Sequence, residues 1–91
     1  MISCRAVLEL RQLDLQRNSI GGAIPDCIGK LKNLLYLNLK DNPHLTGNLP
    51  VAELSRLTKL NRLSLVHCSF LNTDEAVDIL QQRLPRCKIW I

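Results

Sequence analysis

The stretch Leu34-x-x-Leu37-x-Leu39-x-x-Asn42 decides the fold of this 91-residue chain, because its spacing recurs before and after it. The two counterparts are Leu10-x-x-Leu13-x-Leu15-x-x-Asn18 and Leu60-x-x-Leu63-x-Leu65-x-x-Cys68. Leucines two residues apart face one side of a strand, and a strand this short cannot bury that side alone. Stacking successive coils buries the leucines in one continuous core and lets the strands pair in parallel.

A second shared phrase follows the first two repeats and supports the same register. Ile20-Gly21-Gly22-Ala23-Ile24-Pro25 corresponds to Leu45-Thr46-Gly47-Asn48-Leu49-Pro50. Gly22 and Gly47 permit an unusual backbone bend, and the prolines restrict the chain after it. The third repeat lacks this phrase. Residues 51–57 contain neither glycine nor proline, and we expect a helical turn there.

Together these motifs resemble the leucine-rich repeat family, and in particular its plant-type repeats of the form L-x-x-L-x-L-x-x-N-x-L-x-G-x-I-P. The third repeat is similar to a cysteine-containing subclass. The resemblance implies an α/β fold: a short leucine-rich-repeat solenoid with a parallel sheet on its concave face. Asn18, Asn42 and Cys68 then occupy the turn after each strand. A side chain there can form hydrogen bonds with backbone groups that are not paired in the sheet.

The C-terminal segment departs from the repeats. Asn72-Thr73-Asp74-Glu75 is typical of a helix N-terminus, and Ala76, Val77, Leu80 and Leu84 share one helical face. After Pro85, the alternation in residues 87–91 predicts a strand with Cys87, Ile89 and Ile91 inward. We expect one domain over residues 1–91, with a partial leading coil (1–9), three repeats (10–71) and a capping helix and strand (72–91).

The N-terminus shows no comparable cap, because Cys4 and Val7 match Leu54 and Leu57 of a convex half-coil. Two alternatives stay open. The chain is a fragment of a longer repeat protein, or it is a self-assembling module whose first coil is covered by a partner or by a second copy, as in a homodimer.

The side chains between the strand leucines are expected to line the concave surface in columns. Tyr, Trp and Arg are the residue types that most often anchor protein interfaces. We therefore predict a face that binds a protein or peptide, rather than a merely solvated sheet. Its members are Gln12, Asp14, Tyr36, Asn38, Lys40, Asp41, Arg62, Ser64, His67 and Trp90.

The sequence gives little support for catalysis, phosphate binding or zinc binding. Asp41 could orient His67, but no nucleophile stands in a recognisable motif, and Gly21-Gly22 opens no phosphate-binding loop. His67, Cys68 and Cys87 could offer zinc ligands, but adjacent strand residues face opposite ways. We predict a binding module that is not an enzyme and that carries no metal or cofactor.

The cysteines and the distribution of charge predict the redox state, the location and the class of partner. The four cysteines form no C-x-x-C motif and no paired-cysteine caps, so we expect reduced, packed thiols. Arg5 and Glu9 interrupt any export signal, which predicts a cytoplasmic protein, and no run of about 18 apolar residues could span a membrane. The net charge of +4 is spread over convex and cap positions without interleaved aromatics, which disfavours nucleic acid as a partner.

Overall fold

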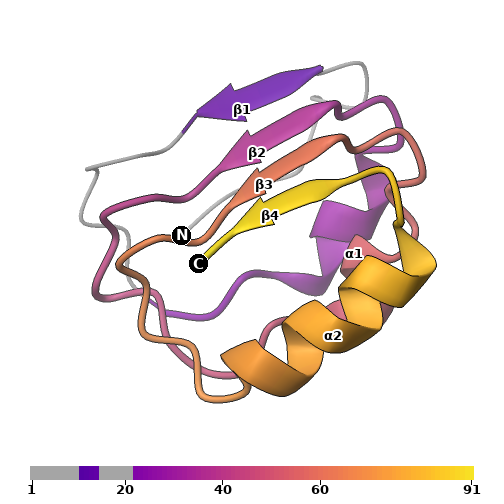
Figure 1. Cartoon of the computed structure of the whole chain (residues 1–91). Coiled ribbons are helices and arrows are strands. Elements are labelled where there is room, and N and C mark those ends of the chain that lie inside the picture. The colour runs from indigo at the N-terminus through magenta and orange to yellow at the C-terminus, as the bar shows by residue number, and fades with distance from the viewer. Residues whose placement is uncertain (1–10, 15–21) are drawn as a thin grey trace.

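The computed structural model describes residues 11–14 and 22–91, and these wind into stacked coils (Figure 1). Each coil contributes one three-residue strand to a four-stranded parallel sheet in the order β1-β2-β3-β4. The strands are β1 (Gln12–Asp14), β2 (Tyr36–Asn38), β3 (Arg62–Ser64) and β4 (Lys88–Trp90). The predicted parallel sheet with one strand per coil is confirmed.

Three short helices form the convex side, opposite the sheet (Figure 1). They are the 3-10 helix η1 (Asp26–Lys30) and the α-helices α1 (Val51–Leu54) and α2 (Thr73–Arg83). η1 packs against α1, and α1 packs against α2, so the helices follow the same order as the strands. The helical turn expected within residues 51–57 is present as α1.

An aliphatic core fills the space between sheet and helices. Leu37 and Leu63 lie opposite each other in register and are fully buried. Leu39 and Leu65, two residues after Leu37 and Leu63, are also buried. Burying one such side chain stabilises the fold by roughly 1.5–3 kcal/mol, so repeating the leucines supplies most of the stability of the stack. Leu13 of β1 is only partly buried against this core.

The turns after β2 and β3 are closed by side chains from the repeat. Asn42 is fully buried, and its Nδ2 donates to the carbonyls of Leu39 at 3.0 Å and Lys40 at 3.3 Å. The Cys68 thiol of the next coil donates to the same Leu39 carbonyl at 3.0 Å. Asn18, the third member of this set, lies outside the described residues.

A second set of backbone bonds joins the coils beyond this turn. The Thr46 N–H donates to the Gly22 carbonyl at 3.1 Å, and the Leu71 N–H donates to the Gly47 carbonyl at 2.9 Å. Gly22 has φ 79° and Gly47 has φ 75°. Glycine adopts this left-handed conformation without the steric cost that a side chain imposes, which confirms the bend predicted at both positions.

The start of α2 differs from the expected helix cap. Asn72 occupies the N-cap position, but its side chain makes no capping bond. Its Oδ1 instead accepts a hydrogen bond of 2.8 Å from the Leu49 backbone N–H of the preceding coil. The predicted helix start at Asn72 is therefore confirmed, but without a side-chain capping bond. A backbone donor between coils competes for the amide, and the nearby Thr73 hydroxyl bonds the Phe70 carbonyl.

The capping segment otherwise has the expected faces. Ala76, Leu80 and Leu84 are buried, and Cys87 lies in the core before β4. The expectation that Ile91 faces inward with Cys87 is wrong, because Ile91 is 60% exposed. Ile91 follows β4 at the edge of the sheet, where no described strand covers it.

We expect Asn42→Ala to lower the free energy of unfolding by about 1–3 kcal/mol, because the buried carbonyl of Leu39 and the partly buried carbonyl of Lys40 lose their amide donor. Urea denaturation followed by circular dichroism measures the change. The matched control is Asn48→Ala at an exposed position, where the change should stay within about 0.5 kcal/mol. Equal effects of the two substitutions would show that the buried amide has no special role.

Candidate functional site

The parallel register aligns the concave side chains in two columns. One runs through Gln12, Tyr36, Arg62 and Lys88, and the other through Asp14, Asn38, Ser64 and Trp90. Lys88 is absent from the predicted set of binding residues. Counting back two positions from Trp90 would have found it, since residues two apart on a strand face the same side.

A shallow groove of about 380 Å³ crosses the sheet over these columns. Seven of the predicted binding residues line it, together with Val66. The seven are Asp14, Tyr36, Asn38, Lys40, Arg62, Ser64 and Trp90. The remaining three, Gln12, Asp41 and His67, are not among its lining residues. The sheet therefore brings most of the candidate residues to one depression.

The floor and walls of this groove differ in character. Asn38 and Ser64 form a buried polar floor, at 5% and 7% exposure. The Oδ1 atom of Asn38 accepts a hydrogen bond of 3.0 Å from the Lys40 backbone N–H, which fixes the amide. Tyr36 is half-buried, whereas Trp90 is 45% exposed. The accessible side chains of the groove are therefore mainly the two aromatic residues and the charged residues.

Positive charge predominates around the groove. Lys40 and Arg62 line it, and Lys88 lies directly beside Arg62 in the register of β3 and β4. Like charges opposite one another on neighbouring strands repel. Asp14 is the single acidic side chain among the lining residues. The arrangement favours a ligand that presents a carboxylate to Arg62 and Lys88.

The predicted pairing of Asp41 with His67 is present at the edge where the strands end. His67 Nδ1 lies 2.6 Å from Asp41 Oδ1. Both residues have φ 60°, a left-handed conformation that Asp and His adopt more readily than most residues. The His67 side chain is 74% exposed, and exposed pairs contribute only about 0–1 kcal/mol. The pair is best described as a surface contact between neighbouring coils.

The cysteines differ from the expected set of reduced thiols. Cys27 is disulfide-bonded to a residue outside the described ranges, whereas Cys68 and Cys87 are free. The expectation is wrong for Cys27, because disulfide formation depends on which cysteines come close in the folded chain, and the sequence spacing does not show this. Disulfides persist most readily in oxidising compartments, so this bond does not favour the cytoplasmic location, which stays a prediction. Within the described part of the chain, no three metal-ligating side chains cluster.

Burial raises the pKa of both free thiols. It raises the pKa of Cys87 to about 11. It also raises the pKa of Cys68, an effect that a hydrogen bond from the Asn42 backbone partly offsets and the charge of Asp41 reinforces. Since the thiolate is the reactive form, both side chains are poor nucleophiles near neutral pH.

We therefore expect two thiols, not four, to react with Ellman's reagent in denaturant without reductant, and four after reduction. In the native protein at pH 8 the two thiols should react slowly, and the rate for Cys87 should rise as the pH approaches 11, because its thiolate fraction grows. Four reactive thiols before reduction would contradict the disulfide. A native rate independent of pH would contradict the raised pKa values.

Two further expectations concern assembly through the first coil and the absence of a membrane-spanning segment. Assembly through the first coil depends on residues 1–9, which lie outside the described ranges, so that alternative stays a prediction. Among the helices in residues 22–91, none has the length and hydropathy needed to cross a lipid bilayer.

Comparison with known proteins supports the repeat pattern. A family model described as leucine rich repeat matches residues 9–70. Over 57 residues the chain is 42% identical to Receptor-like protein 32 of Arabidopsis thaliana, covering 62% of this chain and 6% of that protein. Over 70 residues it is 44% identical to Toll-like receptor 3 of Mus musculus, covering 74% and 8%. Over 63 residues it is 44% identical to Receptor-like protein CLAVATA2 of Arabidopsis thaliana, covering 69% and 8%. The matched segments thus span less than a tenth of each relative.

Proposed function

The chain belongs to the leucine-rich repeat family, and we propose that it is a non-catalytic module that binds a protein or peptide in its concave groove. Three relatives are named as receptors or receptor-like proteins, and the leucine rich repeat model matches residues 9–70 of this chain. These names support a recognition role. They do not identify the ligand, because the chain matches only a small part of each relative.

The observation that carries the proposal is the placement of two aromatic side chains, the half-buried Tyr36 and the exposed Trp90. Tyr36 on β2 and Trp90 on β4 line the same groove, with Ser64 of β3 on the floor between them. Neighbouring strands lie about 4.8 Å apart and successive strand residues about 3.3 Å apart. Tyr36 and Trp90 are offset by two strands and two residues, so they are separated by roughly 12 Å. An apolar side chain of an extended ligand segment fits between two such walls.

The charges then select among such segments. Lys40 and Arg62 line the groove, and Lys88 stands beside Arg62 on the next strand. A ligand carboxylate there would form charge-assisted hydrogen bonds and relieve the repulsion between Arg62 and Lys88. The ligand class that the groove supports best is an extended peptide or protein loop with an apolar residue next to an acidic one.

The test begins with a phage-displayed peptide library selected against the full chain. We expect Tyr36→Ala and Trp90→Ala each to weaken the selected peptides about 30-fold, the equivalent of about 2 kcal/mol for an aromatic anchor. Isothermal titration calorimetry measures the affinities. Leu71→Ala is the control, because Leu71 is 81% exposed and is not a lining residue of the groove. Peptides that bind both aromatic variants as tightly as the wild type would refute the concave site.

A further inference from the structure

A ladder of basic side chains lies away from the concave groove, where each coil turns from its helix back toward the sheet. Lys30, Arg56 and Arg83 occupy equivalent repeat positions, each one residue before a buried leucine. Lys59 and Arg86 share a second position, each two residues after such a leucine. The expectation that basic residues would be spread out is therefore corrected, because stacking places equivalent positions of successive coils side by side.

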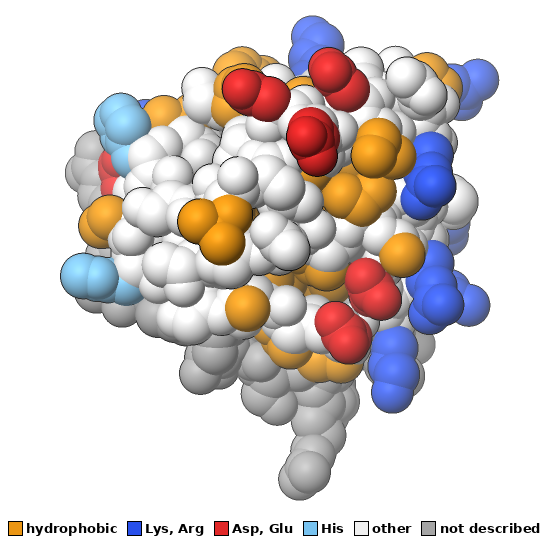
Figure 2. All heavy atoms as spheres, turned by 90° about the horizontal axis from the view of Figure 1, so that it is seen from below, with side chains coloured by type: hydrophobic (Ala, Val, Ile, Leu, Met, Phe, Trp, Pro, Cys, Tyr) orange, Lys and Arg blue, Asp and Glu red, His pale blue; other side chains and the backbone are white. Residues whose placement is uncertain are grey.

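The side chains of the ladder are exposed, and all of them are cationic. All five side chains are exposed, and none forms an ion pair with a described residue. Figure 2 shows Lys and Arg side chains gathered along one edge of the convex side, while the histidines lie at the opposite edge. Repulsion along such a column costs free energy unless a negatively charged partner offsets it.

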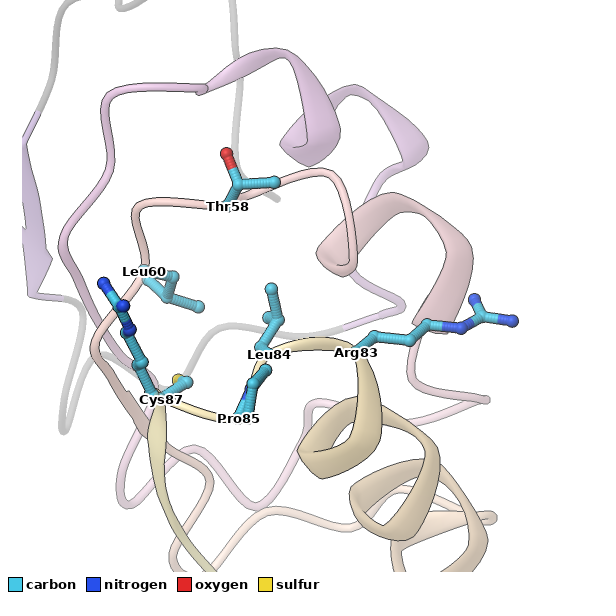
Figure 3. A pocket seen from close by; sticks show the side chains of 7 residues that line it. Thr58, Leu60, Arg83, Leu84, Pro85 and Cys87 are labelled. Atoms are coloured by element: carbon cyan, nitrogen blue, oxygen red, sulfur yellow. The ribbon is translucent and has the colours of Figure 1, made fainter.

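An apolar hollow of about 260 Å³ opens within this ladder (Figure 3). Its lining includes Leu60, Leu84, Pro85 and Cys87, and Arg83 and Arg86 stand at its border. In Figure 3 the side chains of Leu60 and Leu84 point into the space between them, whereas Arg83 extends away from it. The hollow thus combines an aliphatic lining with a cationic border.

The hollow is built into a fixed turn. The Gln81 side-chain amide donates to the Cys87 carbonyl at 3.0 Å, which ties the end of α2 to the start of β4. Arg83 reaches back to the preceding coil, where its Nη1 makes a long hydrogen bond of 3.5 Å with Ser55 Oγ. Leu60, Leu84 and Cys87 are themselves buried in the core. A preformed hollow of this kind loses little entropy when it is filled.

We propose that this edge is a second docking surface, which binds an acidic segment of a partner protein with one aliphatic side chain in the hollow. Asp or Glu residues on either side of that side chain would pair with Arg83 and Arg86, and further acidic residues with Arg56 and Lys59. The volume lies below the roughly 300–1,000 Å³ of small-molecule pockets, which fits a single side chain better than a free ligand.

A protein partner fits this surface better than a nucleic acid. Nucleic acid would satisfy the charges but offers no aliphatic group for the hollow. The three aromatic residues of the chain, Tyr36, Phe70 and Trp90, are not among the residues that line the hollow or form the ladder, so bases would find no stacking platform. Arginine is also enriched at protein interfaces, where its aliphatic stem packs and its guanidinium binds carboxylates.

The probe is a dye-labelled 13-residue peptide with a central leucine and six Asp or Glu residues on each side, titrated against the full chain by fluorescence anisotropy. We expect the combined Arg83→Glu and Arg86→Glu variant to bind at least tenfold more weakly. We expect a peptide with serine in place of the leucine to bind the wild type several-fold more weakly. The matched control combines Arg11→Glu with Lys32→Glu, which makes the same change in net charge at exposed residues that line neither the hollow nor the concave groove, and it should leave binding intact. A variant that combines Arg62→Glu with Lys88→Glu reports any binding of the same peptide in the concave groove. Circular dichroism melts confirm that each variant folds.

Three outcomes would overturn the proposal. Equal binding of the leucine and serine peptides would remove the role of the hollow. Equally tight binding of a polyuridylate of the same charge would assign the ladder to polyanions in general. Loss of binding only in the Arg62 and Lys88 variant would place the acidic peptide in the concave groove. The proposed function does not depend on this result, since its own test rests on Tyr36 and Trp90.

Discussion

Burial of leucines between successive coils is the constraint on which the rest of the structure depends. A strand of three residues, such as β2, cannot exclude water from Leu37 by itself, and Leu37 is fully buried because Leu63 and its coil lie beside it. The same contact fixes the register, since a slip by one residue would turn the buried leucines to the surface. Parallel pairing, the order of the strands and the row of convex helices all follow from stacking coils at one repeat distance.

Fixed register also explains why both candidate surfaces are columns. A residue between two strand leucines must lie beside its counterpart in the next coil, which is how Tyr36 comes beside Arg62. The same rule on the convex side places Arg56 between Lys30 and Arg83 in the order of the coils. Single surface residues in such a fold contribute little to stability, so their types are free to follow binding. A rigid core thereby presents two independent faces.

The sequence predicts the periodic part of the molecule and misses what depends on competition between distant groups. Leucine spacing predicts the sheet and the Asn38–Ser64 register, because it reflects one repeated burial requirement. It could not predict that the Asn72 amide would serve the Leu49 N–H rather than its own helix, since that choice depends on a neighbouring coil. The basic ladder was missed for a related reason, because it arises only when separate coils are brought together. The disulfide at Cys27 was missed because the sequence spacing does not show which cysteines come close in the folded chain.

Where the repeat pattern ends, different side chains provide the hydrogen bonds that the backbone of the coils needs. Asn42 donates from a single amide to two carbonyls, whereas Cys68 at the equivalent position has one weak donor and uses it on Leu39. That donation requires a protonated thiol, and the burial that raises the pKa of Cys68 keeps it protonated. The chain then leaves the plant-type phrase, and Asn72 provides the acceptor that the Leu49 N–H needs. Departures from the repeat sequence are therefore tolerated where each backbone N–H and C=O group between coils still finds a hydrogen-bond partner. The same condition has to be met where a helix and a strand close the stack.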